Sequence, residues 1–186
     1  MNGMSGGMSG EGRTECPQKY FGRYRATVIN NVDPMRMGRV QVIIPDVSNV
    51  IPSTWAMPSS PVGGLQTGMY AVPTIGAGVW IEFEQGDPDY PVISGSFWGS
   101  AAEIPLAAQA APPVTPPIVI QSQAQNRIFI SGTPGDGIRL ETALGPAGPS
   151  IVINPAAGIV LSDGKGAMIT LVGGVVTINQ GALVIK

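Results

Sequence analysis

The sequence predicts an all-β protein in two parts: a small antiparallel barrel, followed by a needle of short strands. Three observations support this fold class. Apolar and polar residues alternate with a period of two, which is typical of half-buried strands. The 26 glycines and 18 prolines are scattered along the chain, so they punctuate many short elements. Residues 19–99 show no 3.6-residue periodicity of the kind that an amphipathic helix would produce.

Residues 19–100 are predicted to form the barrel. A strand over residues 24–30 is followed by a turn rich in Asn, Asp, Pro and Gly, and then by a strand over residues 39–47. These two strands form a hairpin with a multi-residue loop. One face of the second strand carries Val40, Val42 and Ile44.

Three further segments complete the barrel. Residues 53–58 form a short strand with Trp55 and Met57 on one face, residues 68–84 hold two strand candidates, and residues 91–98 form the last strand. In the middle segment one face carries Val79, Ile81 and Phe83. About five antiparallel strands in roughly 80 residues suit a small closed barrel such as the OB fold, because closure removes exposed strand edges.

Two segments are predicted to lie outside the folded parts. Residues 1–18, rich in Gly, Met and Ser, are predicted to be a flexible arm, either without a further role or ordered against a neighbouring subunit. Residues 101–118 are rich in Ala and Pro, and the pairs Pro112–Pro113 and Pro116–Pro117 favour an extended polyproline conformation. We therefore expect a semi-rigid linker there.

From residue 119 to residue 186 the chain reads as an imperfect repeat of short strands. Gly, Pro, Asn, Asp or Ser separate apolar pairs at positions i and i+2, as in a β-solenoid or β-prism. These pairs are Ile118/Ile120, Ile128/Ile130, Ile138/Leu140, Ile151/Ile153, Ile159/Leu161, Ile169/Leu171, Val176/Ile178 and Leu183/Ile185.

A single strand of this repeat cannot stabilise itself. It buries two side chains at roughly 1.5–3 kcal/mol each, against an ordering cost of about 1–2 kcal/mol per residue. Several identical chains that turn these faces toward a shared axis would bury them better. The periodicity does not set the number of chains.

Composition excludes several classes of protein and predicts that the chain is not an enzyme. There is no histidine, so neither a Ser–His–Asp catalytic triad nor a Cys–His catalytic pair can form. The single cysteine, Cys16, excludes an intrachain disulfide and makes a zinc site improbable. The net charge of −2 argues against nucleic acid as a partner. We find no secretory signal peptide and no apolar run of transmembrane length, and we expect no cofactor.

Two carboxylate pairs imitate a general acid and base, but a structural role explains them better. Glu82 and Glu84 lie on one strand face that we expect to point to solvent. Asp87 and Asp89 belong to the turn GDPDYP, in which Gly86 supplies a positive φ and Asp87 caps. We therefore assign no catalytic, cofactor-binding or metal-binding residue.

Other polar and aromatic residues leave alternatives open. Asp136 and Asp163 lie in turns between strands, with an ion site as the alternative. Trp55, Trp80 and Trp98 are expected in the barrel core or at a subunit interface, with a stacking platform for bases or sugars as the alternative. An OB-type module for oligosaccharide or single-stranded nucleic acid is therefore the alternative function.

The motifs of residues 20–99 resemble those of the phage baseplate assembly protein V family, which includes type VI secretion spikes. The matching segments are YRATVINNVDPMRMGRVQVIIPDV, TWAMPSSPVGG and YAVPTIGAGVWIEFEQGDPDYPVISGSFWG, and their combination is specific. The C-terminal strands, ending TINQGALVIK, resemble the family's β-helix less specifically.

This resemblance implies a structural central spike that works as a homotrimer with an intertwined β-helical needle. It also implies an OB end docked on the tail tube hub, a PAAR-like tip protein at the other end, and a target cell envelope to pierce. Assembly is expected in the cytoplasm, as part of a phage tail or injection particle. Two family features are missing: an inserted lysozyme domain, and the histidines of an iron-bearing tip.

Overall fold

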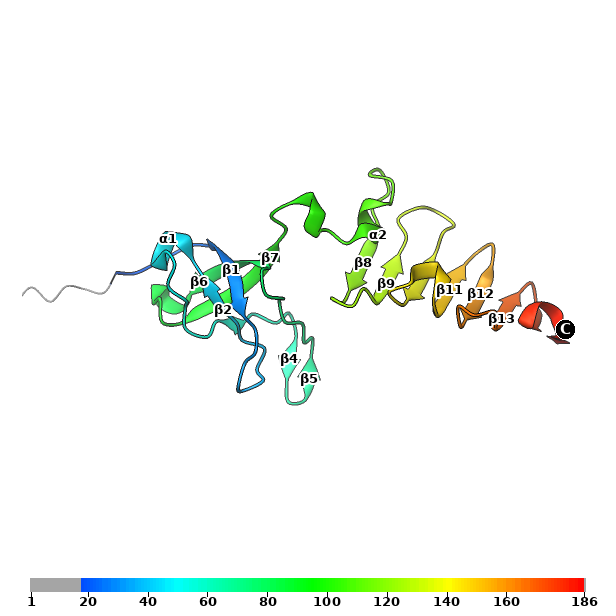
Figure 1. The fold of residues 1–186 in the computed structure, drawn as a ribbon, viewed down its shortest axis with the longest axis horizontal. Helices are drawn as coiled ribbons and strands as arrows, with labels where there is room; N and C mark the ends of the chain where they lie inside the picture. The colour runs from blue at the N-terminus through cyan, green and yellow to red at the C-terminus, as the bar shows by residue number, and fades with distance from the viewer. Residues whose placement is uncertain (1–17, 186) are drawn as a thin grey trace, which may run out of the picture. The chain divides into compact units, whose positions relative to one another are not determined.

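The computed structural model describes residues 18–185, so the predicted arm over residues 1–18, with Cys16, lies almost wholly outside the described residues. The chain divides into two compact units, with the boundary between Phe97 and Trp98. Both units are built mainly from β-strands, as predicted (Figure 1). Within residues 18–185 no helix is long and apolar enough to cross a bilayer.

The N-terminal unit is a curved five-stranded sheet in the order β2-β1-β6-β7-β3. All neighbouring strands are antiparallel except β3 and β7, which are parallel. Two isolated bridges, Val40–Ala56 and Ile43–Pro52, join β2 and the residue before it to the segment that precedes β3, so the sheet is an OB-like half-barrel with a minimal closure. The strands are β1 (Tyr24–Asn30), β2 (Gln41–Ile43), β3 (Met57–Pro58), β6 (Gly78–Phe83) and β7 (Pro91–Phe97).

The core of this unit follows the predicted alternation. β6 has the burial pattern of a half-buried strand, in which Val79 and Ile81 are fully covered and Trp80 between them faces outward. Both predicted apolar faces are confirmed as core. The buried cluster consists of Ala26, Val28, Val40, Val42, Ile44, Ala56, Val79, Ile81, Phe83 and Ile93.

Two predictions for this unit are wrong in detail. The strand predicted over residues 39–47 ends at Ile43, and α1 (Pro45–Ser48) begins there, because proline suits the first turn of a helix and cannot donate to a strand ladder. The strand candidate at the start of residues 68–84 is also absent. A small hairpin precedes it instead, made of β4 (Gly63–Gly64) and β5 (Thr67–Gly68).

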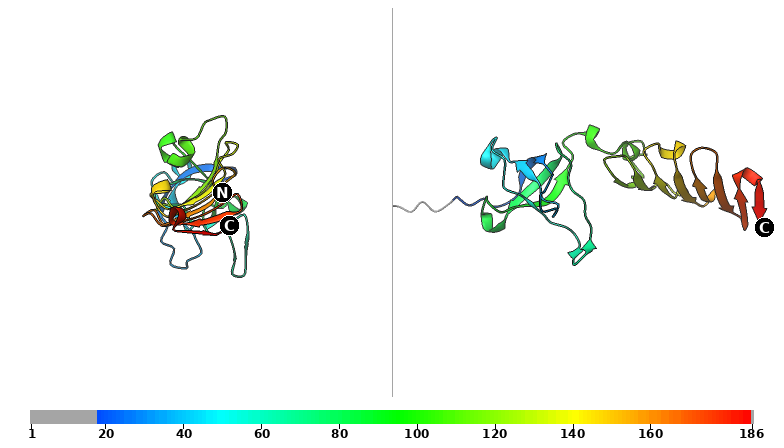
Figure 2. Two further views of the ribbon diagram at one scale, coloured as in Figure 1. Left: turned by 90° about the vertical axis from the view of Figure 1, so that its right-hand side faces the viewer. Right: turned by 60° about the horizontal axis from the view of Figure 1, so that its bottom comes forward.

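The C-terminal unit contains one eight-stranded antiparallel sheet in sequential order from β8 to β15. Within one chain this sheet is open, so the intertwined β-helix predicted from the sequence requires further copies. Figure 2 shows the strands lying side by side. They are β8 (Ile118–Gln121), β9 (Arg127–Ile130), β10 (Ile138–Glu141), β11 (Ser150–Asn154), β12 (Gly158–Ser162), β13 (Met168–Val172), β14 (Val175–Ile178) and β15 (Leu183–Ile185).

The predicted extended linker is partly helical. A 3-10 turn (Ala101–Glu103) and the short helix α2 (Leu106–Gln109) occupy its first half. Alanine is the best helix former, and Pro105 sits at the N-cap of α2, where a missing N–H does no harm. The hydroxyl groups of Thr115 and Thr133 lie 3.1 Å apart, so the end of the linker packs against the C-terminal unit.

Candidate trimer interface

One face of the C-terminal sheet carries two unbroken apolar ladders. The antiparallel register aligns every predicted pair, so that each apolar residue meets another in the next strand. The first ladder is Ile118, Ile130, Ile138, Ile153, Ile159, Leu171 and Val176, which the backbone register pairs with Ile185. The second ladder is Ile120, Ile128, Leu140, Ile151, Leu161, Ile169, Ile178 and Leu183.

The side chains of these ladders remain partly exposed to water in a single chain. The exposed fraction is 62% for Ile118 in β8 and 38% for Leu161 and Ile169 near the middle of the sheet. Soluble monomers rarely leave a contiguous apolar patch of this kind uncovered. Covering the exposed part of one such side chain contributes on the order of 1 kcal/mol, so two ladders of eight residues provide a strong drive to associate.

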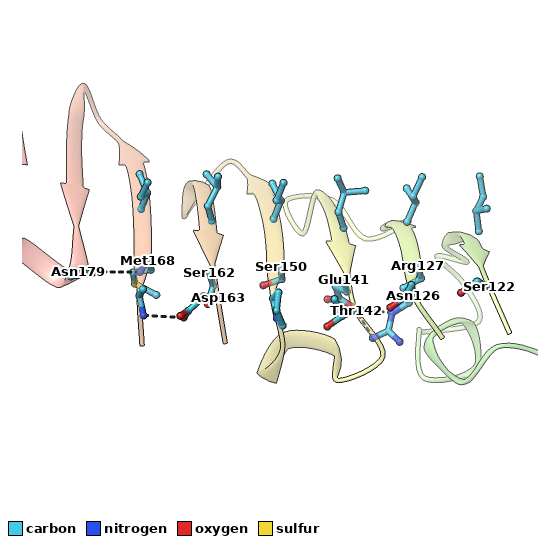
Figure 3. Close-up of a pocket in the computed structure, with 18 of the residues that line it drawn as sticks. Ser122, Asn126, Arg127, Glu141, Thr142, Ser150, Ser162, Asp163, Met168 and Asn179 are labelled. Carbon is cyan, nitrogen blue, oxygen red and sulfur yellow. Dashed lines mark hydrogen bonds and ion pairs between the residues drawn. The ribbon is translucent and has the colours of Figure 1, made fainter. Parts of the chain in front are cut away.

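A groove of about 950 Å³ runs along the second ladder. Its other margin is a row of polar side chains at one end of the strands, including Ser122, Asn126 and Asn179 (Figure 3). The Asn126 side chain accepts a hydrogen bond from the backbone N–H of Ala143, and Asn179 accepts one from Met168, so both amides brace neighbouring strands. The groove therefore has an apolar wall and a hydrogen-bonded polar rim.

The opposite face of the sheet is closed at its first strands. Phe129 is 5% exposed, and the Arg139 guanidinium lies 4.2 Å from the centre of its ring. Arg127 and Glu141 form an ion pair at 2.5 Å, and the Glu141 side chain is only 3% exposed. Residues Ala107 and Ala110 of the linker line a small cavity together with Phe129, so the linker lies over this face.

Charge is nearly absent from the strands of this sheet. Among the residues of β8–β15, only Arg127, Arg139 and Glu141 are charged, and all three belong to the covered cluster around Phe129. The ladders themselves therefore carry no charge that would have to be desolvated when another copy covers them, and the charged residues of the groove, Arg127, Glu141 and Asp163, lie at its polar margin.

The two aspartates predicted in turns are found in turns. Asp163 accepts hydrogen bonds from the backbone N–H groups of Lys165 and Ala167, and these bonds, with that of Lys165 foremost, lower the pKa of its carboxyl. Asp136 pairs with Arg139 at 3.4 Å. Within residues 18–185 no group of three or more His, Cys, Asp or Glu side chains is arranged to hold a metal ion.

In each carboxylate pair of the N-terminal unit, one member lies beside a basic side chain. The Arg23 guanidinium donates to Glu82 at 2.7 Å and is the main cause that lowers the pKa of this carboxyl. Lys19 lies 3.6 Å from Asp87, whose side chain also accepts from the backbone N–H of Asp89 as predicted for a turn. The Glu82 carboxylate, whose lowered pKa keeps it ionised, is a poor general acid.

The three tryptophans do not lie in the barrel core, contrary to one of the two predicted placements. The Arg25 guanidinium lies 5.2 Å from the centre of the Trp80 ring, and that of Arg39 lies 5.5 Å from the centre of the Trp55 ring. Arginine side chains of the same chain therefore lie over these two rings. Trp98 is 63% exposed. The three rings therefore do not offer an open row for stacking bases.

Two features of the structure were not predicted from the sequence. The Arg127–Glu141 pair joins adjacent strands, and no short-range pattern places its members opposite each other. The hairpin over residues 63–68 was also missed, although its paired glycines are a recognised turn signal.

Comparison with known proteins agrees with both units. The family described as the type VI secretion system/phage-baseplate injector OB domain matches residues 24–98. The family described as the phage baseplate V C-terminal trimerisation domain matches residues 117–184, the segment that carries the two ladders.

Curated relatives include the type VI secretion system spike proteins VgrG1c and VgrG1a of Pseudomonas aeruginosa. Each is 33% identical over 102 residues, which are 54% of this chain. The match spans only 13% of VgrG1c and 15% of VgrG1a. The likeness therefore concerns one part of these larger proteins.

Both matched domains are structural, and neither is an enzyme domain. The trimerisation domain, which spans the segment with the exposed ladders, supports a homotrimer. The chain therefore belongs to the phage baseplate V and type VI secretion spike family, as a spike-type component that joins an injector OB domain to a C-terminal trimerisation domain.

Proposed function

We propose that three copies of this chain form the central spike of a contractile phage tail or injection baseplate, and that the spike punctures a target cell envelope. The single observation that carries the proposal is the pair of unbroken apolar ladders on one face of the C-terminal sheet. Three such faces around one axis enclose a dry core along the whole sheet.

The stacked strands give this core the properties of a shaft. Neighbouring strands are about 4.8 Å apart, so eight strands extend roughly 34 Å along the axis. Every strand adds the same two apolar side chains per chain, so stabilisation is distributed along the shaft. Such a shaft resists local failure when it is pushed against a membrane.

The partners of the spike follow from the family. The OB unit docks on the hub of the tail tube, and a PAAR-like tip protein covers the C-terminal end. The particle is assembled in the cytoplasm. The division into an arm over residues 1–18, an OB domain over 19–100, a linker over 101–118 and a β-helix over 119–186 belongs to the same proposal.

The alternative of an OB-type module for oligosaccharide or single-stranded nucleic acid has less support. Arg25 and Arg39 already lie over the rings of Trp80 and Trp55. The net charge of −2 also provides no electrostatic attraction for phosphate.

The decisive experiment places a charge on each face of the same strand. Leu161→Asp puts three carboxylates into the shared core, whereas Val160→Asp puts the same carboxylate on the opposite face of β12. We expect sedimentation equilibrium to give three times the chain mass of 19.2 kDa for wild type and for Val160→Asp, and a monomer for Leu161→Asp. A monomeric wild type, or a trimeric Leu161→Asp, would contradict the proposal.

A further inference from the structure

Two loops of the N-terminal unit project from the same side of the half-barrel and carry exposed apolar side chains. They are the β1–β2 loop and the β4–β5 hairpin, and two views of the chain agree on their common direction (Figures 1 and 2). Met35 is 66% exposed in the first loop, and Leu65 at the tip of the hairpin is 94% exposed. Tyr70, which follows the hairpin, is 72% exposed.

The β1–β2 loop is held rigidly. The Asp33 carboxylate accepts hydrogen bonds from the backbone N–H groups of Met35 and Met37 and from the Arg39 guanidinium, and its side chain is only 3% exposed. The Asn31 side chain donates to the carbonyl of Pro73. A loop fixed by this many bonds loses little further entropy when its apolar tip is covered.

The hairpin is fixed at its base and leans on the first loop. The Ser60 hydroxyl bonds to the carbonyls of Val62 and Met69, which clamps the two ends of the hairpin together. The Tyr70 ring packs against Gly38, where a Cβ would lie 3.1 Å from the ring. The two loops therefore form one preorganised structure.

A groove of about 750 Å³ lies between these loops. It is lined by Ile93 and Ser96 of β7 and by several glycines, and Arg36 is the one charged residue among the lining residues. The hairpin tip has matching properties, since Gly63 and Gly64 leave a slender backbone that bears the single apolar side chain of Leu65. Apart from Arg36, neither the groove nor the hairpin tip carries a charged side chain, so an apolar partner suits both.

We propose that the Leu65 tip of one copy inserts into the groove between the two loops of the next copy, so that three OB units close into a ring. The occupant is a second copy of this chain because the trimerisation domain begins only about 19 residues after the OB match ends, at residues 117 and 98. Because the trimerisation domain follows so soon in the sequence, it holds the three OB units of one trimer at high effective concentration. A tip and a groove are different surfaces, so their contact is heterologous and closes under cyclic symmetry.

The inference rests on the trimer of the proposed function, and the test separates the two. In the full chain with Cys16→Ser, we would combine Leu65→Cys with Ser96→Cys and add a short bismaleimide cross-linker. We expect denaturing gels to shift from the monomer to covalent dimer and trimer. The control pair Val50→Cys with Ser96→Cys uses a residue that is 72% exposed in another loop and should stay monomeric on the gel.

Each other outcome overturns the inference. A trimer in solution without 65–96 cross-links would reject the ring and leave the spike intact. Cross-linking of Leu65→Cys alone would show that the tips meet each other instead of entering grooves. If a thiol reagent labels the cysteine of Leu65→Cys freely in the trimer, the tip is exposed there. The two loops would then be available to bind another protein, such as the hub. A monomeric wild type would reject the proposed function as well.

Discussion

At the scale of single residues, Asp33 shows how a buried charge organises a loop. Its carboxylate has few contacts with water and is paired with Arg39 at 2.6 Å. The hydrogen bonds from Arg39, followed by those from the backbone of Met35, Met37 and Arg39 itself, hold the pKa of Asp33 well below its usual range. The loop therefore depends on this aspartate being ionised.

This dependence predicts how stability changes with pH. The lowered pKa of folded Asp33 means that its stabilisation is present above the pKa of an unfolded aspartate, near 3.9, and is lost as pH falls below that value. We expect Asp33→Asn to lower the melting temperature of the OB unit at pH 7 and to flatten its loss of stability between roughly pH 4 and pH 2.

Urea midpoints measured across that pH range test this expectation. The matched control is Asp46→Asn, which removes an exposed carboxylate from α1 and should keep the wild-type pH profile. Equal profiles for wild type and Asp33→Asn would show that the charge of Asp33 does not stabilise the loop.

At the scale of elements, the turns between strands decide whether the ladders stay aligned. Gly158 begins β12 with a φ of +68°, and a Cβ built there would collide with the backbone carbonyl oxygen of Leu171 in the next strand. This turn therefore needs glycine for two reasons, its backbone conformation and the close approach of β13.

Two alanine substitutions separate these reasons. Gly173 also has a positive φ, of +57°, but open space surrounds it. We expect Gly173→Ala to cost about 1–2 kcal/mol through the left-handed conformation alone, and Gly158→Ala to cost more because β13 must move. Urea unfolding at one fixed protein concentration measures both changes, and equal effects would argue against the close approach.

At the scale of the whole molecule, the two units have different sources of stability. The OB unit has its own buried cluster of ten apolar residues, whereas Phe129 is the one apolar side chain that the described residues of the C-terminal unit bury fully. The C-terminal sheet therefore obtains most of its apolar burial from other copies.

This difference predicts two thermal transitions that respond differently to protein concentration. Unfolding that is coupled to dissociation moves to higher temperature as the protein is concentrated. We expect scanning calorimetry to show this shift strongly for the transition of the C-terminal unit. Two transitions that are both independent of concentration would mean that the sheet folds without partners.

Local pattern was sufficient to predict the strands of the C-terminal sheet. Because successive side chains of a strand point to opposite faces, pairs such as Ile128/Ile130 and Ile159/Leu161 predict strands without any knowledge of their neighbours. The turn at Asp87 and the absence of histidine likewise followed from the chain itself. The mostly-β class needed nothing more.

Tertiary structure decided everything that depends on which strands become neighbours. The alignment of eight pairs into two ladders follows from the antiparallel register, and the Arg127–Glu141 pair exists only because β9 and β10 are adjacent. Trp80 lies outside the core because its neighbours in β6, Val79 and Ile81, face inward. Register and face are set by long-range hydrogen bonding and burial, which short-range sequence patterns do not encode.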